Sequence, residues 1–118
     1  MRIVIVGSET WKDIEAIWRE LEPYWKEHRP KLLVAYAEGG MIAGQVGALC
    51  KTTGIDRAVF PRNDKQEDPD WRRLRIMFRM VQPDLVLAFH PFIQNSKVTK
   101  RALELAASSE IQTKVVAK

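Results

Sequence analysis

Short continuous hydrophobic runs alternate along the chain with longer stretches in which apolar residues have helical spacing. The runs are rich in β-branched and aliphatic residues, a pattern that is typical of strands buried on both faces of a parallel sheet. The clearest run is Asp-Leu-Val-Leu-Ala-Phe at 84–89. We therefore predict strands over residues 2–7, 31–37, 55–60, 83–89 and 111–116.

Between these runs, apolar residues recur at three- and four-residue steps, as in amphipathic helices. Thr10 is the predicted N-cap of the first helix, with Asp13 in the place of a capping-box acid. Gly54 is the expected C-terminal stop of the second helix, and Asn95 or Ser96 the N-cap of the fourth. The helices are predicted over residues 11–27, 41–53 and 70–81, and from 95 or 96 to about 107.

The strict alternation of strands and helices predicts an α/β fold, because right-handed crossovers then give a parallel sheet with helices on both faces. We expect a Rossmann-like three-layer α/β/α arrangement with a five-stranded parallel sheet in the order 3-2-1-4-5. The length of 118 residues fits one domain covering 1–118. In this order the connections reverse direction between strands 1 and 4, and ligands bind in the crevice that opens there at the carboxyl ends.

Three loops and one helix supply the candidate ligand-binding residues at this edge. Glycines permit a close approach of the backbone, and free N–H groups at a helix start favour an anion such as phosphate. The alternatives are that Gly7 only makes a turn, that Thr10 only caps a helix, that Glu38 is solvated, and that His90 is structural. The candidates are Gly7, Ser8, Glu9, Thr10, Trp11, Glu38, Gly39, Gly40, Arg73, His90, Asn95 and Ser96.

Four arginines lie on the third predicted helix. Helical spacing places Arg72, Arg75 and Arg79 on one face, whereas Arg73 projects elsewhere. With Arg62 and Lys65 nearby, these arginines could bind phosphates, or they could form a solvated face opposite the apolar stripe. The net charge of +4 permits an anionic partner without identifying it.

The remaining composition limits the class of protein. The single cysteine, Cys50, excludes an intrachain disulfide and fits a reducing cytoplasm. The sequence shows no signal peptide and no run of roughly 18 apolar residues, so we expect a cytoplasmic protein without a membrane partner. One cysteine and two distant histidines make no usual zinc site, and neither a Walker A loop nor a G-x-G-x-x-G motif occurs. We expect no metal, no cofactor and no catalytic residues.

Several motifs together suggest a family. They are Gly-Ser-x-x-Trp at 7–11, Gly-Gly at 39–40, Arg73 with Met77, and Pro-Asp-Leu-Val-Leu-Ala-Phe at 83–89. On these residues, nearly the whole chain resembles the YspA-like branch of the SLOG superfamily, which includes the LOG phosphoribohydrolases and the DNA-processing protein DprA. The resemblance implies a Rossmann-like fold, a nucleotide or nucleotide-derived ligand at the loops above, a homodimer or higher homo-oligomer, and a bacterial or bacteriophage origin.

The chain departs from this family in its polar residues. Glu9 stands where YspA-like proteins have Arg, and Leu74 stands where they have Asn. Met-Ile-Ala-Gly-Gln at 41–45 replaces Gly-Ala-Asp, and Asn-Ser-Lys-Val-Thr at 95–99 replaces a Gly-rich loop. The Pro-Gly-Gly-x-Gly-Thr-x-x-Glu motif of the LOG enzymes is missing. The backbone turns look retained while the side chains that contact the ligand have changed.

Four functions follow as hypotheses. The first is a sensor or sequestering protein for a nucleotide-like ligand. The second is an N-glycosidic phosphoribohydrolase, for which Glu9 and Glu38 are the candidate carboxylates. The kinship to DprA and the Arg-rich helix suggest nucleic-acid binding, and apolar replacements such as Ile42 and Leu74 suggest a protein-interaction role on an eroded fold.

Overall fold

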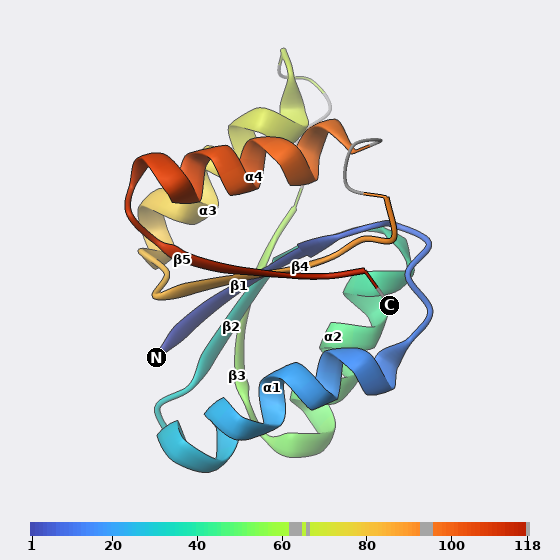
Figure 1. The fold of residues 1–118 in the computed structure, drawn as a ribbon, viewed down its shortest axis with the longest axis vertical. Helices are drawn as coiled ribbons and strands as arrows, with labels where there is room; N and C mark the ends of the chain where they lie inside the picture. Colours follow the sequence, from blue (N-terminus) through green and yellow to red (C-terminus); the bar gives the residue numbers. More distant parts are fainter. Residues whose placement is uncertain (62–64, 66, 93–95, 118) are drawn as a thin grey trace.

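A computed structural model describes residues 1–61, 65, 67–92 and 96–117. Within them, five parallel strands form one sheet, with α1 and α2 on one face and α3 and α4 on the other (Figure 1). The sheet order β3-β2-β1-β4-β5 confirms the predicted fold class. The strands are β1 (Arg2–Gly7), β2 (Leu33–Ala37), β3 (Asp56–Phe60), β4 (Leu85–Phe89) and β5 (Gln112–Val116). The helices are α1 (Ile14–His28), α2 (Gly40–Thr53), α3 (Pro69–Val81) and α4 (Lys97–Ser108).

The central strand β1 explains why continuous hydrophobic runs predict this sheet. Its successive side chains point to opposite faces, and each face is covered by helices. Ile3 and Ile5 pack into the core beneath α1 and α2, whereas Val4 and Val6 pack into the core beneath α3 and α4. A strand with two buried faces has no polar positions to alternate with its apolar ones.

The start of α1 corrects one sequence prediction. The N-cap is Asp13, whose carboxylate accepts a hydrogen bond from the Ala16 N–H at 3.0 Å. Thr10 lies earlier, in the β1–α1 loop, and its hydroxyl is 3.0 Å from that of Ser8. The prediction of Thr10 as the cap is wrong because its side chain is held within the loop, and the carboxylate of Asp13 satisfies the first turn instead.

The structure confirms the predicted end of α2 at Gly54 and the predicted N-cap of α4 at Ser96. Gly54 follows α2 with φ of 78°, the left-handed conformation that glycine adopts most easily, and its N–H bonds to the Cys50 carbonyl. Ser96 caps α4, since its hydroxyl accepts the Thr99 N–H at 3.1 Å. The alternative cap, Asn95, lies outside the described residues. No helix in the described part of the chain combines the length and apolarity that crossing a membrane requires.

Candidate functional site

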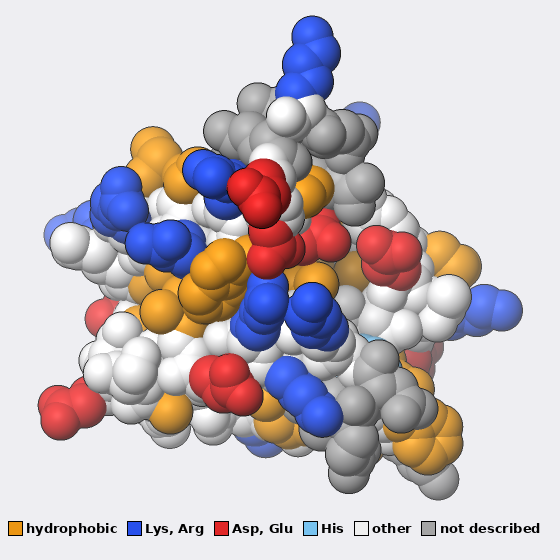
Figure 2. All heavy atoms as spheres, turned by 90° about the horizontal axis from the view of Figure 1, so that it is seen from above, with side chains coloured by type: hydrophobic (Ala, Val, Ile, Leu, Met, Phe, Trp, Pro, Cys, Tyr) orange, Lys and Arg blue, Asp and Glu red, His pale blue; other side chains and the backbone are white. Residues whose placement is uncertain are grey.

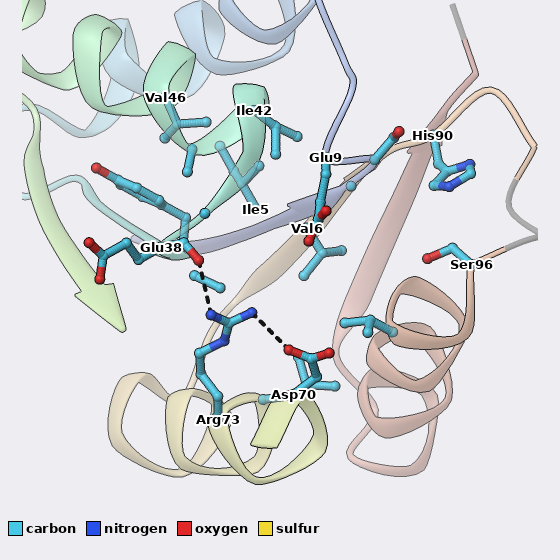
Figure 3. A pocket seen from close by; sticks show the side chains of 18 of the residues that line it. Ile5, Val6, Glu9, Glu38, Ile42, Val46, Asp70, Arg73, His90 and Ser96 are labelled. Carbon is cyan, nitrogen blue, oxygen red and sulfur yellow. Dashed lines mark hydrogen bonds and ion pairs between the residues drawn. The ribbon is translucent and has the colours of Figure 1, made fainter. Parts of the chain in front are cut away.

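A pocket of about 360 Å³ opens at the carboxyl edge of the sheet (Figure 3). It lies between the β1–α1 loop and the first turns of α2, α3 and α4. This is where the connections from β1 and β4 diverge to opposite faces of the sheet, as the strand order predicts. Its volume is within the range of sites that hold small molecules.

The floor and walls of the pocket are apolar. They come from the end of β1 and from the inner faces of α2 and α3, and all of these side chains are buried. Ile42 and Leu74, which the predicted resemblance to the SLOG superfamily singles out as apolar replacements, both belong to this wall. The buried side chains are Ile5, Val6, Ile42, Val46, Leu74 and Met77, and the half-buried Ala43 of α2 lies beside them.

Arg73 is the most deeply placed charged group of the pocket. Its side chain is only 13% exposed, and its guanidinium donates to the Glu38 carbonyl oxygen at 2.9 Å. A second guanidinium nitrogen lies 3.4 Å from the carboxylate of Asp70 (Figure 3). Arg73 therefore faces the pocket and ties α3 to the end of β2, which confirms that it projects away from the face shared by the other arginines of α3.

Among the charged side chains around the opening, acids outnumber bases by three to two. Glu9, Glu38 and Asp70 line the pocket, against the cations Arg73 and Lys97. The Glu9 side chain points into the pocket from the β1–α1 loop (Figure 3). Because Asp70 and the Glu38 carbonyl already engage Arg73, two of its nitrogens are occupied and the nearby carboxylate offsets part of its attraction for an anion.

Ser96 marks a different part of the opening. It lies with His90 on the side opposite Glu38 and Arg73 (Figure 3). Here α4 begins, and Ser96, Lys97 and Val98 all line the pocket. A helix start carries partial positive charge from its unpaired N–H groups, and Lys97 adds a full charge to it. This side of the pocket is therefore the one that favours an anion.

Gly7 is required by strand packing, whatever binds nearby. A Cβ atom there would lie 2.4 Å from the Phe89 carbonyl oxygen and 2.6 Å from Cδ1 of Ile42. Gly7 pairs with Phe89 in the sheet and also lines the pocket. The structural alternative is thus sufficient to explain this glycine.

Gly39 and Gly40 have φ of 116° and 77°, backbone conformations that glycine adopts more easily than other residues. The close approach at Gly40 is to this chain itself. A Cβ there would lie 2.9 Å from Cα of Glu9, and the Met41 N–H donates to the Glu9 carbonyl at 2.7 Å. These contacts place α2 directly against the β1–α1 loop. Gly39 lines the pocket, whereas Gly40 faces the loop and lies outside the pocket lining.

The structure bears on two expectations for the first loop. At the start of α1 the Asp13 carboxylate already accepts the Ala16 N–H, one of the groups that a phosphate would use. Trp11 is 6% exposed and does not line the pocket. Its ring lies 5.5 Å from that of Phe89, and its Nε1–H donates to the Asp13 carbonyl at 2.9 Å. Trp11 is therefore a core residue that holds the loop in place. Burying its large indole ring stabilises the fold, and the ring N–H keeps a hydrogen-bond partner.

His90 lines the pocket and also has a structural role. Its Nδ1 accepts the Phe92 N–H at 3.0 Å, which shapes the start of the loop after β4. Ser8 and Thr10 also line the pocket and hold each other through their hydroxyls. The candidate Asn95 lies outside the residues that the structure describes.

Sequence reasoning missed Asp70 and Lys97 as pocket residues. For both residues, the position along the chain could have predicted this location. Asp70 precedes Arg73 by three positions on a helix, a spacing at which opposite charges meet. Lys97 directly follows the N-cap of α4, so it had to lie at the same edge as Ser96. Over the described ranges, no group of His, Cys, Asp and Glu side chains is arranged to hold a metal ion.

The fold and the pocket together define a class: a Rossmann-like α/β protein with a cavity of small-molecule size at the point where its strand order reverses. No family model matches the chain, and no curated protein or solved structure is significantly similar to it. The relationship to the SLOG superfamily thus stays a prediction from the motifs.

Proposed function

We propose that this protein binds a nucleotide or nucleotide-derived small molecule in the strand-end pocket, as a sensor or sequestering protein. The observation that carries the proposal is the position of a pocket of about 360 Å³ where β1 and β4 diverge, with apolar walls and convergent polar groups. Crevices at this point of parallel sheets are the usual ligand sites of the fold class. The motifs shared with the SLOG superfamily favour the same class of ligand.

The distribution of polar groups suggests how the ligand lies. A base would fill the apolar part between Ile42, Val46 and Leu74. Sugar hydroxyls are donors, so they would face the carboxylates of Glu9 and Glu38. A phosphate would face the start of α4, where Lys97 and the helix N–H groups are, because the acidic side of the pocket repels it.

Isothermal titration with adenosine, AMP, ADP-ribose and a cyclic dinucleotide tests this proposal. We expect saturable binding of at least one phosphorylated ligand, weakened several-fold by Lys97→Gln. Binding of adenosine should change little in that variant, because it has no phosphate. Lys100→Gln is the matched control, since Lys100 is exposed on the same helix and does not line the pocket. Absence of binding by all four compounds at millimolar concentration would contradict the proposal.

The same samples separate a binding protein from a hydrolase. After incubation, chromatography should recover the bound nucleotide intact. Release of the free base, abolished by Glu9→Gln, would instead show that Glu9 acts as an acid or base beside the glycosidic bond.

A further inference from the structure

A second concave surface lies between α3 and α4, away from the strand-end pocket. It is a groove of about 500 Å³ formed by the C-terminal half of α3 and the end of α4. The pocket touches the opposite, N-terminal ends of the same helices. The floor of the groove is apolar and consists of Phe78, Pro83, Leu105 and Ile111. We call this surface the α3–α4 groove.

Two arginines on α3 border the α3–α4 groove. Arg75 and Arg79 are exposed and stand one helical turn apart, at the i and i+4 positions. At this spacing like charges repel each other and reduce the stability of a helix. Figure 2, which looks onto α3 and α4, shows Lys and Arg side chains beside hydrophobic ones on this face, with Asp and Glu side chains elsewhere on it.

These two cations lack the partners that neighbouring arginines have. Arg101 binds Asp68 at 2.9 Å, and Arg72 donates to the Glu67 carbonyl at 2.7 Å. Among the described residues, neither Arg75 nor Arg79 has an ion pair or hydrogen bond, although Arg75 lies 5.9 Å from the Trp71 ring. No described carboxylate lines the groove. The groove thus joins an apolar floor to uncompensated positive charge.

We propose that the α3–α4 groove is a docking site for an acidic amphipathic helix of a protein partner. An apolar stripe on that helix would cover the floor, as in other complexes where a helix lies in a groove. Two carboxylates one turn apart on the partner would match the spacing of Arg75 and Arg79. The charge complementarity would steer association and fix the register of the helix.

The apolar floor distinguishes this occupant from a nucleic acid. Nucleic-acid binding depends mainly on phosphate contacts, which need cations along a surface and gain little from buried aliphatic side chains. In the α3–α4 groove, Leu105 and Ile111 are half-buried and line the surface together with the two arginines. The α3–α4 groove lies outside the strand-end pocket, so a partner helix could bind there whether or not the pocket holds a nucleotide.

Fluorescence anisotropy with defined peptides tests this inference. The probe is a labelled helical peptide of about two heptads, with Leu along one face and Glu on both sides of it. One control peptide carries Gln at each Glu position, and a second carries Ala at each Leu position. A labelled single-stranded oligonucleotide is titrated in parallel. We expect saturable binding of the Leu/Glu peptide alone, weakened by added salt.

Variants locate the binding surface. Arg75→Gln with Arg79→Gln should weaken the Leu/Glu peptide at least tenfold. Arg19→Gln with Lys51→Gln removes the same charge from α1 and α2, on the other face of the sheet, and should leave the affinity unchanged. Circular dichroism checks that both double variants keep the wild-type fold. Equal binding by both double variants, no binding of the peptide at low salt, or tighter binding of the oligonucleotide that depends on Arg75 and Arg79 would each overturn the proposal.

Discussion

Single glycines in this protein mark places where two main-chain segments touch. Gly40 allows α2 to approach the β1–α1 loop, with Glu9 on the other side of the contact. Gly44 lies one turn further along α2, exposed, and a Cβ there would meet nothing within 4 Å. Replacing these two glycines of α2 by alanine should therefore change the free energy of unfolding in opposite directions.

The substitution Gly40→Ala should lower the free energy of unfolding by about 1–3 kcal/mol, because Gly40 has a positive φ and its new Cβ would meet Glu9. Gly44→Ala should raise it by about 0.5–1 kcal/mol, as alanine does in a helix interior. Urea denaturation of both variants measures the difference. Equal effects of the two substitutions would show that the contact with Glu9 is unimportant.

Cys50 gives a prediction about pH. Its side chain is 2% exposed, and burial raises the pKa of the thiol from 9.0 to about 11, with an opposing influence from Arg57. The folded state therefore binds the thiol proton more tightly than the unfolded state does. The resulting contribution to the free energy of unfolding is fully present below pH 9 and is lost between pH 9 and 11. Relative to Cys50→Ala, the wild type should lose about 2 kcal/mol of stability by pH 11.

Denaturation of both proteins at several alkaline pH values measures this loss. Other alkaline groups titrate in both, so only the difference between the two curves reports on Cys50. Parallel curves between pH 9 and 11 would show that the thiol titrates at its ordinary pKa in the folded protein.

The sequence could not place the residues that pair across the pocket. Helical spacing correctly separates Arg73 from Arg72, Arg75 and Arg79, because it depends only on position along one helix. The contact between Arg73 and the Glu38 carbonyl depends on how α3 docks beside β2, which no local pattern encodes. The same reason explains why Trp11, next to a rim loop, could be mistaken for a ligand-binding residue.

Among the elements, the strands are more predictable than the starts of the helices. Burial on both faces leaves a continuous run of apolar residues, so strands such as β4 are recognised from composition alone. A helix start depends on which of several nearby oxygens meets the first-turn N–H groups. Thr10 and Asp13 both qualify by residue type, and only the path of the loop decides between them.

The cap of α1 can be tested by a pair of substitutions. Asp13→Ala should destabilise the protein by about 1 kcal/mol, because the Ala16 N–H loses its carboxylate acceptor. Thr10→Ala should have a smaller effect, since it removes only an exposed hydroxyl contact with Ser8. Thermal denaturation followed by circular dichroism compares them. A larger loss with Thr10→Ala would reverse the assignment of the cap.

For the whole molecule, the order of the strands follows from the alternation of elements and the handedness of the crossovers. That order also locates the pocket at the centre of the sheet, because the neighbouring strands β1 and β4 continue into α1 and α4, which cover opposite faces. The chemistry of the pocket is different. Its walls combine residues from β1, α2 and α3, so its apolar character emerges only when three separate segments meet.

The central position of β1 has a consequence for the order of events during synthesis. β1 is made first, yet one of its two neighbours is β4, whose Phe89 pairs with Gly7. While the ribosome adds the intervening residues, one edge of β1 has no strand to pair with. The apolar side chains of Val4 and Val6 also lack the residues of α3 and β4 that they pack against in the folded protein. Pairing between such distant segments is slow, and exposed strand edges invite aggregation. Nascent chains stalled before residue 85 should therefore be protease-sensitive, and chains released beyond β5 should be resistant.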